Sequence, residues 1–222
     1  RVLGPLEDGV SPPPYNEPER AKLVTSFAAR PMWLAADVPM AELSLIAQAH
    51  RHVERRAHRT LLVLTPRIVA DGMAMADLLR SDGFTVACRS AGEIPKEATQ
   101  IYIADTGDGL GLWCRLAPMT YLGGSFSDGE IPDPFAPATV GSAVLVGQRV
   151  AQFTDHIDRL VSAQALHSVA APEVLGRAVE TLLATDYAAQ LAHAAWDVTS
   201  RGADATNDLV TLIYTFIDRL DP

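Results

Sequence analysis

Short apolar runs alternate with longer amphipathic segments over much of the chain. The runs are apolar almost throughout instead of at every second position, which is typical of parallel strands covered by helices on both faces. They predict strands at Met32–Ala36, Leu61–Thr65, Phe84–Arg89, Gln100–Ala104, Met119–Leu122 and Ala143–Val146. Helical spacing predicts the segments between them, at about Met40–His58, Asp71–Ser81, Leu110–Leu116 and shortly after Asp133. We therefore predict an α/β fold, a Rossmann-like doubly wound parallel sheet of about six strands.

The two ends of the chain differ from this pattern. The first twenty residues are rich in proline and glycine, and include the run Pro12-Pro13-Pro14, which favours an extended path. From Val150 onward the spacing is almost entirely helical. The expected organisation is an extended linker over 1–20, a Rossmann-like domain over 21–185 and C-terminal helices over 186–222, the last of them at 203–220. Because the chain opens without methionine on what reads as the end of a strand, we expect the protein to continue before Arg1.

Composition and charge restrict the possible partners. The 222 residues are 48% hydrophobic and 20% charged, which suits one globular domain with appendages. A net charge of −9 disfavours general nucleic-acid binding, so no nucleic-acid partner is expected. Cys88 and Cys114 lie in apolar segments without zinc-site spacing, and we expect buried free thiols. No apolar run reaches the roughly 20 residues that span a bilayer, and no signal-peptide pattern is present.

Ligands of a doubly wound sheet bind beyond the carboxyl ends of the strands, and three of the expected ends carry suitable residues. Arg67 follows the second strand, and it is interpreted either as a phosphate ligand or as a surface arginine in a turn. A glycine-rich turn follows the fourth strand, where Asp105 and Thr106 are both able to cap the next helix. Because Leu112 stands where a dinucleotide fingerprint needs its third glycine, a NAD site is disfavoured against a capped helix start.

The third strand end is Leu122-Gly123-Gly124-Ser125, followed by the irregular stretch Phe126–Pro132. Paired glycines allow a ligand to approach the backbone closely, and Asp133 followed by Pro134 predicts the start of a helix. A loop with this many special-backbone residues is more typical of a binding loop than of a simple connection.

Several of these segments resemble, in order and spacing, the motifs of one enzyme family. They are Ile101–Thr106, Leu110–Trp113, Leu116–Pro118, Leu122–Ser125 and Asp133–Gly141, preceded by Trp33–Ala36, Ala49–Arg51 and Pro66-Arg67. Together they are similar to the C-terminal domain of 3-deoxy-D-manno-octulosonate (Kdo) transferases. The resemblance covers about residues 1–185 and is densest over 101–146. It implies a two-domain GT-B glycosyltransferase of lipopolysaccharide biosynthesis, whose C-terminal domain binds CMP-Kdo or a related nucleotide sugar.

On this resemblance, residues 21–185 are the nucleotide-sugar-binding domain, and Arg67 would meet the nucleotide phosphate. The pocket would be lined by Asp108, Gly109, Leu110, Gly123, Gly124 and Ser125, with Asp133 near the anionic ligand. No catalytic residue, cofactor or metal is expected in this chain. The general base and the site for the lipid A precursor would belong to an N-terminal domain, so the chain alone is expected to be inactive. The full-length protein would be cytoplasmic and peripheral to the bacterial inner membrane.

Some polar positions of the family's motifs are replaced. Pro132, Asp133 and Ala136 stand where the family has His, Asn and Glu, and Ile68 stands where it has His. Asp108-Gly109 stands where the family has a Gly-Glu pair before Leu110, so the expected carboxylate is either missing or displaced by one residue. These replacements favour an alternative hypothesis, a degenerate and non-catalytic GT-B domain that serves as a structural or partner-binding module.

Three further features have mainly structural interpretations. The basic residues that end the helix near His58 complement the helix dipole. The neighbours Asp155 and His156 do not predict a metal site, because the sequence offers no full set of ligands beside them. Trp113 and Trp196 are expected in the core.

Overall fold

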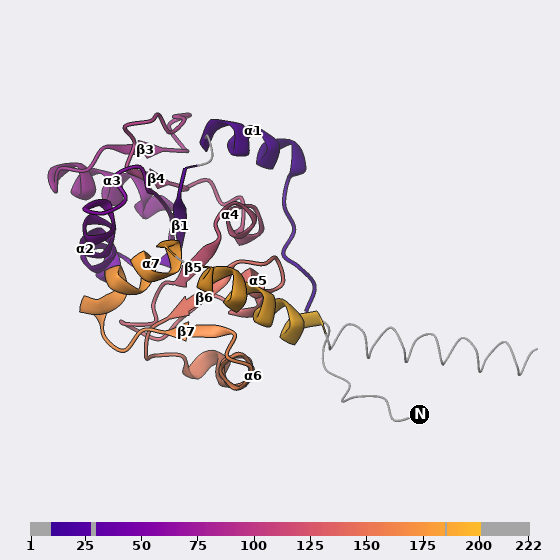
Figure 1. The fold of residues 1–222 in the computed structure, drawn as a ribbon. Helices are drawn as coiled ribbons and strands as arrows, with labels where there is room; N and C mark the ends of the chain where they lie inside the picture. The colour runs from indigo at the N-terminus through magenta and orange to yellow at the C-terminus, as the bar shows by residue number, and fades with distance from the viewer. Residues whose placement is uncertain (1–9, 28–29, 185, 201–222) are drawn as a thin grey trace, which may run out of the picture.

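A computed structural model describes residues 10–27, 30–184 and 186–200 of the chain. Parallel strands form one seven-stranded sheet in the order β3-β4-β2-β1-β5-β6-β7 (Figure 1). The strands are β1 (Met32–Val38), β2 (Leu61–Pro66), β3 (Val86–Cys88), β4 (Ile101–Ile103), β5 (Met119–Leu122), β6 (Ala143–Val146) and β7 (Leu166–Ser168). The predicted doubly wound parallel sheet is confirmed.

The seventh strand, β7, is one that the apolar pattern did not predict, because helical spacing was expected from Val150 onward. It has three residues and pairs with β6 at the edge of the sheet. Leu166 is buried whereas Ser168 is exposed, so no continuous apolar run marks the strand. The sheet therefore has seven strands where six were expected.

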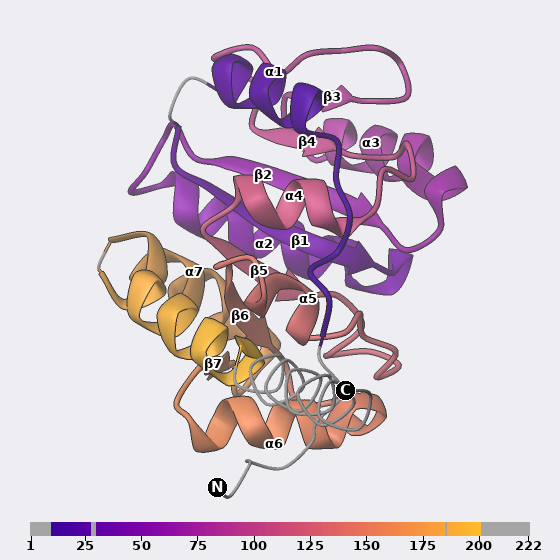
Figure 2. The ribbon, with the colours of Figure 1, turned by 90° about the vertical axis from the view of Figure 1, so that its right-hand side faces the viewer.

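Helices cover both faces of the sheet (Figures 1 and 2). One layer contains α2 (Leu43–Glu54), α3 (Gly72–Ser81) and α7 (Leu175–Ala184), and the other contains α1 (Glu17–Phe27), α4 (Leu110–Leu116), α5 (Phe135–Ala138) and α6 (Thr154–Ser162). Short 3-10 turns lie at Met40–Glu42, Val69–Asp71, Ala151–Phe153 and Pro172–Val174. In β1, Trp33 packs into the core of the first layer and Leu34 into the core of the second. Burial on both faces explains why the strand is apolar throughout.

A further helix, over 187–200, crosses the edge of the sheet. Its Leu191 packs into the core with α2, α3 and α7, whereas its Val198 packs with α5 and α6. Trp113 is buried as expected, but Trp196 is 50% exposed, which corrects its assignment to the core, because the helix turns a different side toward the sheet. The helix expected over 203–220 lies outside the described residues.

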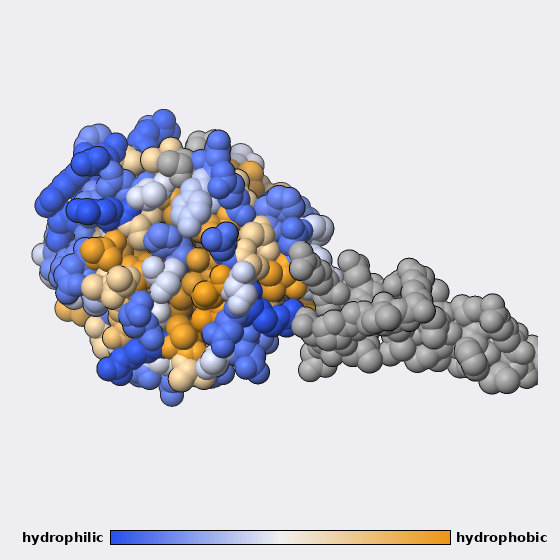
Figure 3. All heavy atoms as spheres, turned by 60° about the horizontal axis from the view of Figure 1, so that its bottom comes forward, coloured by the Kyte–Doolittle hydropathy of each residue, from blue (hydrophilic) through white to orange (hydrophobic). Residues whose placement is uncertain are grey.

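The surface on this side of the molecule is partly apolar. Figure 3 shows apolar side chains gathered near the middle of this face, with polar residues around them. Val161 of α6 and Trp196 are among the exposed large apolar side chains of the described residues. In those same ranges, no helix has both the length and the apolar character needed to cross a bilayer.

Two smaller expectations can be compared with the structure. Cys88 and Cys114 are buried and free, as predicted. The second helix ends at Glu54, before the expected end near His58, and its basic end contacts another helix. His52 and Arg56 pair with Glu180 of α7 at 2.7 and 3.0 Å, so these side chains join the end of α2 to α7.

Candidate functional site

The order of the strands creates a crevice between β1 and β5. From β1 the chain builds β2, β3 and β4 on one side, and then crosses to β5 on the other side of β1. Ligands of doubly wound folds bind at such a reversal, beyond the carboxyl ends of the strands. A hollow of about 330 Å³ lies at this place, lined by Asp37, Arg67, Glu130, Ile131, Pro132 and Gln152.

Arg67 supplies the basic group of this hollow. Its backbone N–H donates to the carbonyl oxygen of Val38 at 3.0 Å, which ties the end of β2 to the end of β1. Its side chain is only 21% exposed, and one guanidinium nitrogen pairs with Asp128 at 2.5 Å. The guanidinium also donates to the carbonyl oxygen of Glu130, whose carboxylate lies 3.6 Å away. Arg67 is therefore a held cation at the crevice and not a free surface arginine in a turn.

Asp37 faces the same hollow from β1 and has an unusual backbone. Its φ is 52°, in the left-handed region that few residues other than glycine adopt, and its N–H donates to Thr65 Oγ1 at 2.8 Å. Burial raises the pKa of the Asp37 carboxyl, although the nearby Arg67 acts in the opposite direction. A strained residue of this kind at a strand end is a candidate for function.

Glu42 organises the loop on the other side of the crevice, and the sequence reading missed it. The side chain is 2% exposed, and Oε2 accepts hydrogen bonds from Tyr121 Oη and from the N–H of Gly124, both at 2.9 Å. Oε1 accepts from the N–H of Phe126 and from Ser127 Oγ, also at 2.9 Å. Burial, and then the neighbouring Glu42, raise the pKa of Tyr121 well above its usual value, so its hydroxyl remains a donor. The sequence feature that could have indicated this role is a single acidic residue among apolar ones, a few residues after the end of a strand.

The turn after β5 brings backbone and guanidinium close together. Gly124 has a φ of 87°, and a Cβ there would overlap the Arg67 guanidinium and the carbonyl oxygen of Glu130. A Cβ on Gly123 would overlap the backbone of Asp37. Both glycines are therefore required by close contacts within the protein. Ser125 is fully buried, donates to Leu122 O at 2.7 Å and accepts from Gly147 N–H at 2.8 Å, so its hydroxyl is directed into the protein.

Asp133 lies at the start of α5, next to an imidazole. Its Oδ1 accepts from the N–H of Phe135, the first residue of α5, at 2.9 Å, and lies 2.9 Å from His156 Nδ1. The His156 ring stacks on Phe135 with 3.9 Å between centroids and 3° between planes. Across the described residues, no group of three or more His, Cys, Asp or Glu side chains is arranged to hold a metal ion.

Of the pocket residues predicted after β4, Asp108 lines a second hollow, of about 410 Å³, beside α1, whereas Gly109 and Leu110 are not among its lining residues. Asp108 binds Arg89 at 2.6 Å, and Arg89 also pairs with Glu19 of α1 at 3.1 Å. Burial acts to raise the pKa of Asp108, but hydrogen bonds from Thr106 and Arg89 outweigh it and hold the pKa below its usual value. Gly109 has a φ of 75° and precedes Leu110, the first residue of α4. The structure therefore places this turn and Arg67 around different hollows.

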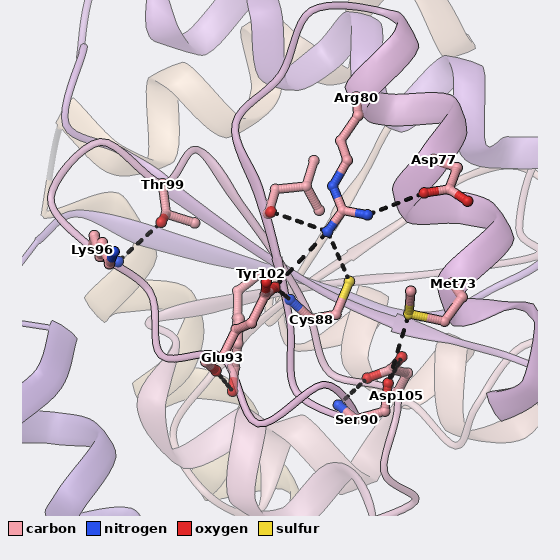
Figure 4. Close-up of polar contacts among 11 residues, drawn as sticks. Met73, Asp77, Arg80, Cys88, Ser90, Glu93, Lys96, Thr99, Tyr102 and Asp105 are labelled. Carbon is pink, nitrogen blue, oxygen red and sulfur yellow. Dashed lines mark hydrogen bonds and ion pairs between the residues drawn. The ribbon is translucent and has the colours of Figure 1, made fainter.

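Asp105 was expected to be able to cap α4, but Figure 4 shows that it binds Ser90 instead. It is 4% exposed and accepts from Ser90 N–H at 2.8 Å and from Ser90 Oγ at 2.6 Å, so it ties together the loops after β3 and β4. The cap position of α4 is Gly109, without a side-chain hydrogen bond. Nearby, an Arg80 guanidinium nitrogen lies 3.6 Å from Cys88 Sγ. This cluster is structural: it fixes the ends of β3 and β4.

Known proteins resemble this chain in sequence. It is 29% identical over 192 residues to a 3-deoxy-D-manno-octulosonic acid transferase of Haemophilus influenzae, a match covering 86% of this chain and 45% of that protein. It is also 29% identical over 165 residues to a probable mitochondrial 3-deoxy-D-manno-octulosonic acid transferase of Arabidopsis thaliana, covering 72% of this chain and 37% of that one. The chain thus spans less than half the length of these relatives. No protein-family model matches it.

Solved structures support the fold. The C-terminal CMP-Kdo binding domain of WaaA from Acinetobacter baumannii has a TM-score of 0.76 and 20% identity, with 82% of this chain and 96% of that chain covered. The C-terminal domain of the glycosyl transferase LpcC from Francisella tularensis has a TM-score of 0.56 and 10% identity, covering 84% and 93%. The resemblance to Kdo transferases is confirmed by the sequence matches, and the chain has the Rossmann-like fold of a GT-B glycosyltransferase domain.

Proposed function

We propose that this chain is the C-terminal, donor-binding part of a Kdo transferase-like glycosyltransferase, which binds CMP-Kdo for transfer to a lipid A precursor. One observation carries the proposal: Arg67 is held at the crevice between β1 and β5, where doubly wound folds bind ligands. The motif resemblance independently assigns the nucleotide phosphate to the same residue. A guanidinium is suited to a phosphate because its N–H groups form paired, charge-assisted hydrogen bonds.

The proposed chemistry divides between this chain and an N-terminal domain. The acceptor hydroxyl oxygen attacks the anomeric carbon of the sugar, its proton passes to a general base, and the bond to the CMP phosphate oxygen breaks. The base and the acceptor site are assigned to the N-terminal domain, which would also bring the enzyme to the inner membrane. Arg67 would offset the charge that grows on the departing phosphate.

The organisation follows from this assignment. We propose residues 21–185 as the donor-binding domain, with the extended segment before it as a linker and the C-terminal helices after it. Among the described parts of these segments, residues 10–16 have no regular secondary structure, residues 17–20 belong to α1, and the helix over 187–200 packs on the sheet. The pocket residues Asp108 to Leu110, Gly123 to Ser125 and Asp133 remain proposals.

A titration with CMP tests the function, with binding measured by calorimetry and by NMR chemical shifts. We expect Arg67→Ala to weaken binding by about 10- to 100-fold, since one or more charge-assisted hydrogen bonds are lost. The matched control is Arg177→Ala, the same change at an exposed position of α7, which should bind as the wild type does. No response to millimolar CMP would refute donor binding and favour the alternative, a non-catalytic module.

A further inference from the structure

The loop after β5 holds two acids against the guanidinium that is proposed to bind phosphate. One guanidinium nitrogen of Arg67 lies 2.5 Å from Asp128 Oδ2 and 3.6 Å from the Glu130 carboxylate. The other terminal nitrogen donates to the carbonyl oxygen of Glu130. Both ends of the guanidinium fork are therefore engaged by this loop. A phosphate that binds Arg67 in the same paired manner needs those hydrogen-bonding positions.

Hydrogen bonds within the loop fix the position of these acids. The N–H of Gly129, whose φ is 82°, donates to Gly124 O at 2.9 Å, and the N–H of Glu130 donates to Asp128 Oδ1 at 3.1 Å. At its base, the loop is fixed by three hydrogen bonds to Glu42, from Gly124, Phe126 and Ser127. Because the base of the loop is anchored, its tip is held against Arg67. The contact therefore follows from the fold of the loop and is not a chance pair of surface side chains.

The charges around the hollow also indicate that a bound phosphate would share Arg67 with neighbouring acids. Asp37 and Glu130 line it, Asp128 lies against its cation, and Arg67 is the basic group among its lining residues. Burial acts to raise the pKa of Asp128, but the hydrogen bond from Arg67 outweighs it and lowers the pKa below its usual value. Asp128 is consequently an anion at neutral pH. An anionic ligand meets acids that compete for the same cation.

We infer that Asp128 and Glu130 form an acidic latch on the donor site: they compete with the donor's phosphate for Arg67 and thereby set its affinity. The inference rests on the proposed function. Asp128 carries most of the effect, because its carboxylate is closer to Arg67 and is 45% exposed, whereas that of Glu130 is 78% exposed. The competition acts on the phosphate alone, so the affinity for the uncharged nucleoside does not depend on it.

The test compares CMP with cytidine on the full chain. Asp128→Asn keeps an oxygen that accepts from Arg67 and removes the charge; we expect CMP to bind about 3- to 10-fold more tightly, and cytidine unchanged. Glu130→Gln should change CMP binding in the same direction by a smaller factor. The matched control is Asp77→Asn, which removes a 72% exposed acid paired with Arg80 and should change neither ligand. Thermal unfolding of each variant checks that the fold is retained.

The outcomes separate the latch from the function on which it rests. If wild-type protein binds CMP through Arg67 but Asp128→Asn binds it no more tightly, the latch is wrong and donor binding stands. An equal change for CMP and cytidine also overturns the latch, because the effect is then not on the phosphate. If neither wild type nor variant binds CMP, both the proposed function and the latch fail.

Discussion

Replacing Glu42 by glutamine should destabilise the protein through a single backbone group. The two carboxylate oxygens each accept one backbone N–H, from Gly124 and Phe126, and one hydroxyl, from Tyr121 and Ser127. In glutamine one oxygen becomes an NH₂ group, which cannot accept. The hydroxyl next to it can turn and accept instead, but the backbone N–H cannot. In either orientation of the amide, one N–H loses its acceptor, at a buried site for Gly124 and at a part-buried one for Phe126.

The expected loss is about 2–3 kcal/mol in the free energy of unfolding, the value of one hydrogen bond to a charged group plus an unsatisfied buried donor. For a chain of this size it corresponds to a melting temperature roughly 5–10 °C lower. Urea unfolding of Glu42→Gln and wild type measures it. Glu97→Gln is the control, since Glu97 is 82% exposed and lies 3.7 Å from Arg59, and it should stay within about 0.5 kcal/mol of wild type. If Glu42→Gln also stays within that margin, the loop has other acceptors and the reasoning is refuted.

Three further predictions concern backbone, pH and thiol chemistry. Gly124→Ala and Gly92→Ala both place a Cβ at positive φ, 87° and 71°, but only at Gly124 does it overlap Arg67, so calorimetry should show weaker CMP binding for Gly124→Ala alone. Burial lowers the pKa of His50 to about 3 from 6.5, so the unfolded chain binds a proton that the folded one excludes; urea unfolding should show stability falling from about pH 6.5 toward 3, and falling less steeply in His50→Gln. Burial raises the pKa of Cys114 to about 12, so labelling by a thiol reagent at pH 8 should be slow in folded protein and fast in urea.

The fold was largely predictable because the strands at its centre are buried on both faces. β1 and β2 are apolar in almost every residue, a pattern that surface strands do not show. β7 escaped prediction for the opposite reason: at the sheet edge it needs only one buried residue, and its neighbours in sequence are helical. The exposed Trp196 was misplaced because its apolar position in a helical segment does not show which side of that helix faces the sheet.

The site was predictable only in part, because long-range contacts decide what each polar group does. The position of Arg67 after a strand was enough to locate it at the crevice, but nothing local indicated that Asp128 would engage it, 61 residues away. Glu42 resembles any acid at the start of a helix until the loop after β5 folds over it. Asp105 was expected to be able to cap α4, the next helix along the chain, for a similar reason. The sequence does not show that Ser90, at the end of a different strand, lies close enough to donate to its carboxylate.

These contacts also change what the glycine turn after β5 offers a phosphate. Such turns commonly bind anions through free backbone N–H groups. Here the N–H of Gly123 donates to Ala36 O at 2.7 Å, and those of Gly124 and Phe126 donate to Glu42. A buried carboxylate and a backbone carbonyl thus occupy three of the donors that this turn could offer a phosphate. The proposed binding of a nucleotide phosphate then depends mainly on Arg67, which is why the acids that share this guanidinium should have a measurable effect on affinity.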